Sequence, residues 1–442
     1  MRRYKALVLC ALMAGLIFNG CSKTEKNIDV DSLIKPSDAS AGIKLADSEK
    51  SGEGNTENEE VFDMIIWNNS LDSKYIENAF SAKYPDANLK IVSFDAADTE
   101  KVTKALASNE TIDIITYYRE GFGNFNSIDV FEDLLQPQYD FDSIKSVFNE
   151  REIEQCKSFD DSKLIALPFP EYPMVTYYRA DILGQYGFPT DPEELAEYMS
   201  TTEGWMKIAA ELKKHDIYAI QWKEELLQKV LRSYAFYDDD MKLNINNEKI
   251  RETLKLTLAV SKANLSSRIN IWGEDGQKAI KDGKIAMLYV NKWGENYLKS
   301  FVPEQAGKWR ATSLPLDVYG YQSSSYASIV SSSKLKMQAW EILKRYMVND
   351  YDYIDKQRNA ESEFLGGQKS MQLYEDLINK MPLRYPTILD DRDYSTFFDI
   401  LYNNMDQRGT EEILNLAISK IDESTYHEQK VLAEYLKENR KK

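Results

Sequence analysis

The sequence predicts an α/β protein with a parallel sheet wrapped by helices, followed by a helix-rich second half. Three short runs rich in β-branched and aromatic residues, 63–67, 89–94 and 112–117, alternate with segments of helical periodicity at 72–84 and 98–108. Strand, helix, strand, helix, strand with short loops is the order typical of a parallel sheet. The chain has 442 residues, of which 43% are hydrophobic and 12% aromatic, enough for two or three domains with sizeable cores.

The bounds of the first helix follow from its flanking residues. Asp72 can accept hydrogen bonds from the first backbone N–H groups of a helix, and Pro85 cannot continue one. Between them Tyr75, Ile76 and Phe80 recur at helical spacing. By the same criteria, helices are expected over 192–198, 205–213, 223–234, 248–263, 335–346 and most of 350–380 and 394–437, with one further strand at 284–290.

The carboxyl ends of the first and third strands carry polar and aromatic residues. Trp67, Asn68 and Asn69 end the first strand, and Tyr117 and Tyr118 end the third. In an open α/β sheet, ligands bind beyond the carboxyl ends of the parallel strands. These ends are therefore the predicted location of a ligand site.

The N-terminus has the features of a bacterial lipoprotein signal. Three basic residues lie within the first five positions, an apolar run covers 6–18, and Gly20-Cys21 follow. The run is too short to span a bilayer as a mature helix. The end of this segment resembles the lipobox, although Phe18 and Asn19 depart from its usual residues. We therefore predict a signal peptide at 1–20 and a lipidated Cys21; the alternative is an ordinary signal peptide with an incidental cysteine.

A polar segment follows the predicted anchor. Residues 22–60 contain no aromatic residue and are rich in Ser, Lys, Asp, Glu and Gly, which is the composition of a disordered tether. As a flexible coil, a segment of this length spans about 35 Å. We therefore expect a globular body that begins near Phe62, outside the cell, held away from the membrane surface by a tether at 21–60.

Charge and residue usage exclude several classes of function. Lys and Arg number 55 against 72 Asp and Glu, giving a formal charge of −17, which becomes −20 when three positive charges leave with residues 1–20. No basic run is present for nucleic acid. The mean hydropathy of −0.51 argues against a polytopic membrane protein. The acidic surface suits a neutral or cationic ligand.

Cysteine and histidine are too scarce for most metal and nucleophilic chemistry. Cys156 is the only cysteine outside the signal and the predicted anchor, and His215 and His427 are the only histidines. A Cys-based zinc site and an intrachain disulfide are excluded, and a His-based catalytic triad is disfavoured. We expect no cofactor and no metal.

Short matches to catalytic and metal-binding motifs are incomplete. Gly121-Phe122-Gly123 lacks the third glycine of a dinucleotide-binding turn, and Ser331–Lys334 has no Lys-Thr-Gly after it. The spaced acids Asp350, Asp352 and Asp355 lack the glycine of a calcium loop. A carboxylate pair for glycoside hydrolysis cannot be singled out among 72 acids, so an extracellular carbohydrate-active hydrolase is the main enzymatic alternative.

Aromatic residues give the positive signal. The chain has seven Trp and 28 Tyr, and several lie in predicted loops, among them Tyr172, Trp222, Trp272 and Trp293. Flat aromatic faces pack on the apolar faces of sugar rings, while Asn, Asp, Glu and Arg bind the hydroxyls. For any one aromatic residue alone, packing in the core is the competing explanation.

Four segments between 62 and 359 together resemble the extracellular solute-binding proteins of ABC importers, of the maltodextrin-binding type. The first is DSKLIALP at 161–168 followed by VTYYRADIL at 175–183, in which Arg179 stands where the family usually has asparagine. The others are YGFP with PEEL at 186–195, GKIAM with Trp293 at 283–293, and LP at 314–315 with AWEIL at 339–343.

The resemblance implies two α/β lobes joined by a hinge that the chain crosses several times. The first lobe would comprise 61–170 plus 284–325, and the second, helix-rich lobe 171–283 plus 326–442. In this family the ligand binds between the lobes, the lobes close on it, and the closed form docks on a membrane permease. No reaction is catalysed. The expected partners are a small solute, an ABC permease and, through Cys21, the lipid bilayer, with no nucleic acid; the protein itself is expected to be a monomer.

Carried over by position, the resemblance implies ten ligand contacts. A sugar or oligosaccharide is the favoured ligand; a peptide, a polyamine or another small solute is the alternative. At least one of the two indoles of Trp67 and Trp293 is predicted to stack on the ligand. The implied contacts are Trp67, Asn68, Asn69, Tyr117 and Tyr118 in the first lobe, Glu171 and Tyr172 in the hinge, Trp222 and Trp272 in the second lobe, and Trp293 after the returning strand.

Overall fold

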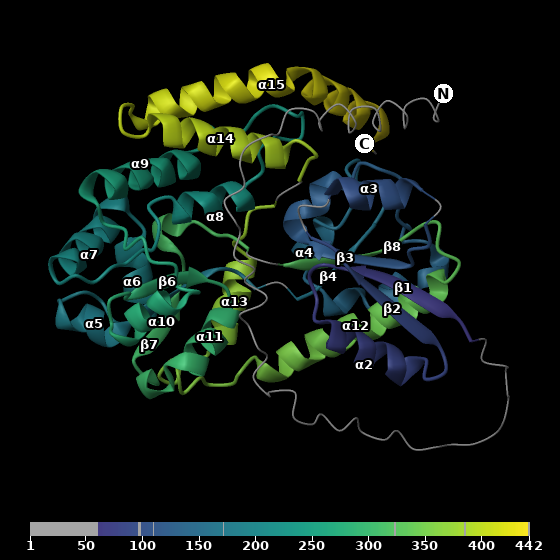
Figure 1. Ribbon diagram of the computed structural model, residues 1–442, viewed down its shortest axis with the longest axis horizontal. Coiled ribbons are helices and arrows are strands. Elements are labelled where there is room, and N and C mark those ends of the chain that lie inside the picture. Colours follow the sequence, from purple (N-terminus) through teal and green to yellow (C-terminus); the bar gives the residue numbers. More distant parts are fainter. Residues whose placement is uncertain are drawn as a thin grey trace.

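Two sheets, each with its own hydrophobic core, divide the protein into two lobes (Figure 1). The structure is a computed structural model that describes residues 61–95, 99–108, 110–170, 172–321, 324–383 and 386–440. The predicted signal peptide, Cys21 and the tether lie outside these residues. Within the described ranges, no helix has the length and apolar composition needed to cross a membrane.

The first lobe is built on a five-stranded sheet of order β2-β1-β3-β8-β4. Strand β1 (Asp63–Asn68) is parallel to β2 (Asn88–Ser93) and to β3 (Ile114–Tyr118). Strand β8 (Ser325–Ile329) is antiparallel to both β3 and β4 (Leu167–Pro168). The predicted parallel arrangement of the first three strands is thereby confirmed, and the carboxyl ends of β1 and β3 lie side by side.

Helices cover both faces of this sheet (Figure 1). Helix α2 (Ser73–Lys83) begins where the Asp72 carboxylate accepts a hydrogen bond from the Lys74 N–H, at 2.8 Å, as its sequence predicts. It packs beside α12 (Lys336–Gln357). The remaining elements of the lobe are α3 (Thr99–Ala107), α4 (Glu150–Glu154) and the short 3₁₀ helices η2 (Arg119–Asn124), η3 (Pro137–Tyr139), η4 (Phe141–Ser143) and η5 (Lys145–Val147).

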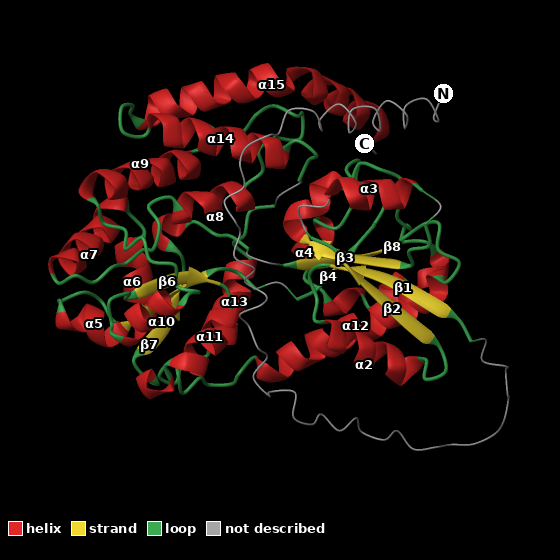
Figure 2. Ribbon diagram, viewed as in Figure 1, coloured by secondary structure: helices red, strands yellow, loops and turns green. Residues whose placement is uncertain are grey.

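The second lobe has a smaller sheet and more helix, as predicted (Figure 2). Strand β5 (Val175–Arg179) is the centre, with β6 (Met287–Val290) and β7 (Trp309–Thr312) antiparallel on either side. A hydrophobic cluster lies on each face. The helices are α5 (Ala180–Gln185), α6 (Pro192–Met199), α7 (Thr202–Lys214), α8 (Glu225–Ser233), α9 (Glu248–Ala263), α10 (Glu274–Lys281), α11 (Trp293–Phe301), η6 (Pro303–Gln305), η7 (Pro315–Asp317), α13 (Ser370–Ile378), α14 (Asp390–Asn404) and α15 (Thr410–Asn439).

The expected division of the later chain between the lobes is wrong in two places. The resemblance implies that residues 284–325 belong to the first lobe, but β6 and β7 within them pair with β5 in the second. It also implies that residues 326–442 belong to the second lobe, but β8 pairs with β3 and α12 packs in the core of the first. The reason is that the chain forms β6 and β7, the two antiparallel neighbours of β5, before it returns to the first lobe.

The hinge contains two crossings that run alongside each other. The Phe169 N–H donates to the Ser325 carbonyl oxygen at 2.9 Å, and the Met174 N–H donates to the Gly320 carbonyl oxygen at 2.8 Å. The chain crosses a third time after α12, because α13 lies in the second lobe. The prediction that the hinge is crossed several times is therefore confirmed.

The two long helical regions expected near the C-terminus are each interrupted. Between α12 and α13, Gly366 and Gly367 have φ angles of 66° and 87°, which an α-helix cannot contain. Between α14 and α15 the chain turns at 405–409, and Gly409 begins the new helix with a bond from its N–H to the Glu412 carboxylate, at 3.0 Å.

Candidate ligand-binding site

The turn after β1 is held by the side chain of Asn68. Its carbonyl oxygen accepts hydrogen bonds from the Thr116 hydroxyl, at 2.5 Å, and from the Leu71 N–H, at 3.0 Å. Its amide nitrogen donates to the Leu71 carbonyl oxygen at 2.8 Å. Asn68 is buried, and both its amide oxygen and its amide nitrogen bond to the protein, so it shapes the turn that carries Asn69.

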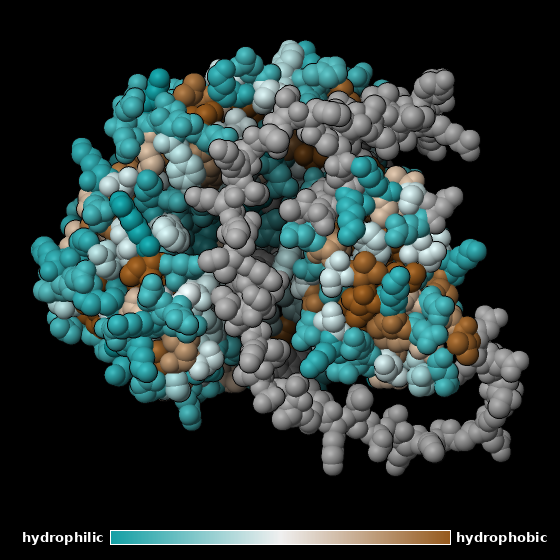
Figure 3. Space-filling view, in the orientation of Figure 1, coloured by the Kyte–Doolittle hydropathy of each residue, from teal (hydrophilic) through white to brown (hydrophobic). Residues whose placement is uncertain are grey.

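A cavity of about 380 Å³ lies where this turn meets the end of β3. Both lobes contribute to the wall of this cavity, so the shape of the cavity depends on the distance between the lobes. Figure 3 shows a hollowed and mainly hydrophilic surface between the lobes. The lining residues are Asn69, Phe94, Val102, Tyr117, Tyr118, Glu120, Gly121, Asn124 and Phe125 from the first lobe, and Arg232 and Asp391 from the second.

Several buried polar atoms beside this cavity have no hydrogen-bond partner among the described residues. Two belong to lining residues, Oδ1 of Asn69 and Oε2 of Glu120. Two more, the hydroxyls of Ser70 and Ser324, lie next to them: the Ser325 hydroxyl donates to the Ser70 carbonyl, and the Arg119 N–H donates to the Ser324 carbonyl. Buried polar groups are rarely left unpaired, so this group can accept a ligand that supplies hydroxyls.

The wall from the second lobe is an ion pair. Nη1 of Arg232, at the end of α8, lies 2.7 Å from Oδ1 of Asp391, at the start of α14, and the guanidinium lies over the Tyr394 ring at 3.8 Å. Burial opposes the charge of Arg232, but Asp391, Tyr394 and Glu120 outweigh it and raise its pKa, so it stays a cation. Glu120 acts on it from the other lobe.

An aromatic group of the second lobe lies beside the hinge. Trp293, the first residue of α11, packs against Trp272, with ring centroids 4.8 Å apart, and both are half-buried. Next to Trp293, Nζ of Lys292 lies 4.5 Å from the centre of the Tyr172 ring and 3.3 Å from its hydroxyl. Burial lowers the pKa of Lys292.

A second and larger cavity, of about 620 Å³, also lies between the lobes. Its walls come from η5, α4 and α12 of the first lobe and from α13 of the second, with Pro170 and Tyr172 of the hinge. It shares no lining residue with the smaller cavity. Of the nine predicted contact residues that the structure describes, Tyr172 alone lines it.

The structure thus separates the predicted contact residues into groups. Asn69, Tyr117 and Tyr118 line the smaller cavity, while Tyr172, Trp272 and Trp293 lie on the second-lobe side of the hinge. Trp67 is buried and packs against Phe94, behind the cavity wall. The remaining three do not line either cavity or cannot be placed: Asn68 is buried, Trp222 is 40% exposed on the second lobe, and Glu171 lies outside the described residues.

Sequence reasoning did not find Glu120, Arg232 or Asp391. Glu120 lies two residues after Tyr118, and its position just past a strand end was the available signal. Arg232 and Asp391 come from helix ends more than 150 residues apart in sequence, and only the fold brings them together. No local pattern marks either of them.

A two-lobed α/β fold with a polar cavity between its lobes is the architecture of a solute-binding protein. The comparison with known families agrees: a profile of the bacterial extracellular solute-binding proteins matches residues 76–371, and the chain belongs to that family. It is therefore an extracytoplasmic binding protein of the kind that serves ABC importers, and not an enzyme.

Relatives of known ligand share sequence or fold with this chain. A lactose-binding protein of Rhizobium radiobacter is 26% identical over 344 residues, which cover 69% of this chain and 78% of the relative. The galacto-N-biose/lacto-N-biose I-binding protein of an ABC transporter from Bifidobacterium longum superimposes with a TM-score of 0.65 at 16% identity, over 83% of this chain and 97% of the other. The sugar-binding protein MalE from Xanthomonas citri gives 0.61 at 14% identity, over 84% and 98%.

Proposed function

We propose that this protein captures a sugar or oligosaccharide between its lobes and delivers it to an ABC permease. The observation that carries the proposal is a group of unpaired buried oxygens beside a cavity that is lined by both lobes. These oxygens belong to Asn69, Ser70, Glu120 and Ser324. A sugar offers many hydroxyl donors and apolar ring faces, which match these oxygens and the aromatic walls. The sugar-binding relatives support the same ligand class.

The mechanism is closure without chemistry. A ligand that contacts Asn69 and Glu120 on one lobe and the Arg232–Asp391 pair on the other is bound most tightly when the lobes are together. It shifts the protein toward that arrangement by its difference in affinity for the two states. The closed form then presents both lobes to the permease, and opening releases the sugar.

Titration calorimetry against lactose, lacto-N-biose and maltose tests the ligand class. The expected result is binding of at least one sugar by the parent and weaker binding by Asn69→Ala, because the variant removes an unpaired acceptor of the cavity. Asn88→Ala is the matched control, since Asn88 is exposed and bonds Asp63 at the far end of the same strand pair. A protein that ignores every sugar yet binds peptides or polyamines would contradict the proposal.

A second measurement separates binding from turnover. Incubation with the bound oligosaccharide, followed by chromatography, should return the sugar uncut. Shorter products that copurify with the protein would contradict the proposal.

We further propose that residues 1–20 are removed and that Cys21 carries the lipid that anchors the protein to the outer face of the cytoplasmic membrane. The charged start, the apolar run and Gly20-Cys21 support this, together with the polar segment that follows. Cys21→Ser should release the protein into the medium. If the variant stays with the membrane, the anchor lies elsewhere.

A further inference from the structure

The last helix of the protein reaches from one lobe to the other. Helix α15 packs along α14 and α9 in the second lobe, and it lies beyond residue 371, where the match to the family ends. In Figure 1 it runs along the top of the molecule, from above the second lobe toward the first. Its final turns therefore meet side chains of the first lobe.

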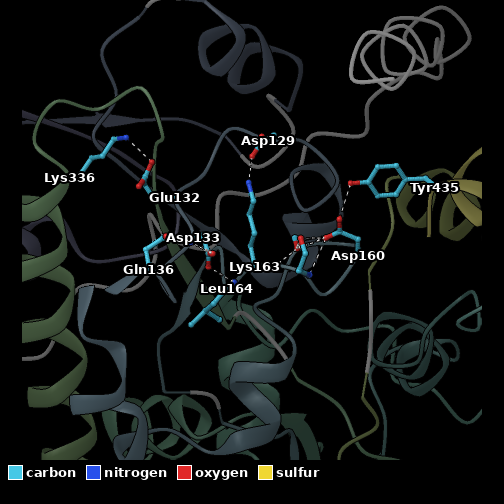
Figure 4. A network of polar contacts seen from close by, with 11 residues as sticks. Asp129, Glu132, Asp133, Gln136, Asp160, Lys163, Leu164, Lys336 and Tyr435 are labelled. Carbon is cyan, nitrogen blue, oxygen red and sulfur yellow. Dashed lines mark hydrogen bonds and ion pairs between the residues drawn. The ribbon is translucent and has the colours of Figure 1, made fainter. Parts of the chain in front are cut away.

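The loop that receives α15 is organised by its own hydrogen bonds (Figure 4). Oδ1 of Asp160 accepts from the hydroxyls of Ser158 and Ser162, both at 2.7 Å, and from the Ser162 N–H at 3.2 Å. The Ser158 N–H donates to the Lys163 carbonyl oxygen at 2.9 Å. These bonds leave Oδ2 of Asp160 directed away from the loop.

The same loop is tied to the body of the first lobe. The Lys163 ammonium pairs with Asp129, and the Leu164 N–H donates to the Asp133 carboxylate at 3.2 Å. Nearby, Glu132 pairs with Lys336 at the start of α12, at 2.8 Å (Figure 4). Loop 158–163 therefore moves with the first lobe.

Three contacts join the end of α15 and Arg440, the residue that follows it, to this loop. The Tyr435 hydroxyl donates to Oδ2 of Asp160 at 3.2 Å, and its ring stacks on Phe159 with centroids 6.3 Å apart. Nε of Arg440 forms an ion pair with Oδ2 of Asp161 at 2.8 Å, with the two side chains 27% and 28% exposed. The side chain of Phe159 is buried in the hydrophobic cluster of the second lobe, although its loop is part of the first lobe. The contact is thus apolar at its centre and ionic at its edge.

The start of the same C-terminal segment makes a second attachment to the first lobe. The Asn126 amide nitrogen donates to the Pro386 carbonyl oxygen at 2.8 Å, and both groups are buried. The backbone of Thr387 lies against Gly123, where an added Cβ would come 2.5 Å from the Thr387 carbonyl oxygen. Four residues later, Asp391 enters the cavity wall. The segment that supplies this wall is therefore fixed to both lobes.

We propose that segment 386–440 is an interlobe latch, which holds the lobes in the arrangement that encloses the 380 Å³ cavity through the contacts of Tyr435 and Arg440 with loop 158–163. Opening the lobes moves the loop away from α15 and breaks these contacts. Their free energy is thereby part of the equilibrium between the open and closed forms. The latch raises ligand affinity without touching the ligand, because the closed form is more populated before binding.

The test is the double variant Tyr435→Phe/Arg440→Gln of the full-length protein. These changes remove the hydroxyl donor and the guanidinium but keep the ring stack and the helix. Lys420→Gln is the matched control, because Lys420 lies on the same helix and pairs only locally with the exposed Glu423. In small-angle X-ray scattering without sugar, the double variant should have a larger radius of gyration than the parent. The control should have the same radius of gyration as the parent. Circular dichroism checks that α15 stays folded.

The affinity measurement rests on the proposed function, and the scattering measurement does not. Where the parent binds a sugar by calorimetry, the double variant should bind it about three- to tenfold more weakly, through a faster dissociation rate. Asp161→Asn repeats the test from the loop side without changing α15. A radius of gyration and an affinity equal to those of the parent, or tighter binding by the variant, would overturn the latch. If no sugar binds the parent, the proposed function fails while scattering still decides the latch.

Discussion

At the scale of single residues, Trp67 supports the cavity and does not line it. It is 4% exposed, and its ring lies 6.0 Å from that of Phe94, which does line the cavity. We expect Trp67→Ala to cost about 3–5 kcal/mol of stability, as for other buried tryptophans. Trp293→Ala should cost less, because Trp293 is half-buried, and should weaken sugar binding if its indole stacks on the ligand. Urea unfolding and calorimetry on both variants check this; equal stability losses would contradict it.

A second residue-scale prediction concerns a buried acid. Burial raises the pKa of Asp393 to about 7, although its bond from the Tyr237 hydroxyl opposes the shift. The folded protein therefore holds a proton that the unfolded chain releases near pH 4, so stability is lost as pH rises from there through about 7. Asp350, whose pKa burial also raises to about 7, contributes in the same direction.

Asp393→Asn isolates the effect of that one carboxyl. The amide resembles the protonated acid, so the stability of the variant should fall less than that of the parent between pH 5 and pH 8. Asp399→Asn, at an exposed position on the same helix, should keep the slope of the parent. Urea midpoints measured across this pH range provide the comparison, and parallel curves for Asp393→Asn and the parent would refute the assignment.

At the scale of elements, η2 joins the first lobe to the C-terminal segment through a close backbone contact. A Cβ at Gly123 would lie 2.5 Å from the Thr387 carbonyl oxygen, whereas one at Gly121 would meet nothing within 4 Å. We expect Gly123→Ala to cost about 1–3 kcal/mol, the usual range for overpacking. Gly121→Ala, two residues away in the same 3₁₀ helix, should be close to neutral. Chemical unfolding of both variants tests this prediction. Equal losses of stability would show that the backbone of Thr387 moves away from Gly123 at little cost.

The elements differ in how well the sequence predicts them. The first three strands and α2 have strong apolar periodicity and a clear cap, and they occur where expected. Strands β7 and β8 were not predicted, because WRAT is short and SYASI lies in a Ser-rich stretch that resembles a loop. The rule that ligands bind at the carboxyl ends of parallel strands also predicted that Asn69 and Tyr118 belong to the ligand site. Arg232 and Asp391 could not be predicted, because their proximity depends on how α8 and α14 pack.

At the scale of the whole molecule, lobe membership is decided by strand pairing and not by order along the chain. Strand β6 completes the second lobe and β8, the next strand but one, completes the first, although nothing in either segment says which sheet it joins. The choice depends on which sheet edge each strand reaches after the hinge. A chain that crosses three times and ends in a helix touching both lobes should respond to ligand as one unit.

The buried thiol of Cys156 can report on that response. A form lacking residues 1–21 has Cys156 as its sole cysteine, and the residue is fully buried in the core of the first lobe. Because the residue is 0% exposed, a reagent reaches the thiol only when this core opens. Labelling by a small thiol reagent at low concentration then measures the population of that opening.

A sugar held between the lobes should slow this labelling, even though Cys156 does not line the cavity. If opening of the first lobe destroys the site, a sugar at 100 times its Kd should lower the labelling rate about 100-fold, which corresponds to about 2.7 kcal/mol of added stability. Asn69→Ala, measured at the same sugar concentration, should lose most of this protection because it binds more weakly. Unchanged labelling in the presence of a sugar that calorimetry shows to be bound would mean that the second lobe alone holds the ligand, and that the cavity between the lobes is not the binding site.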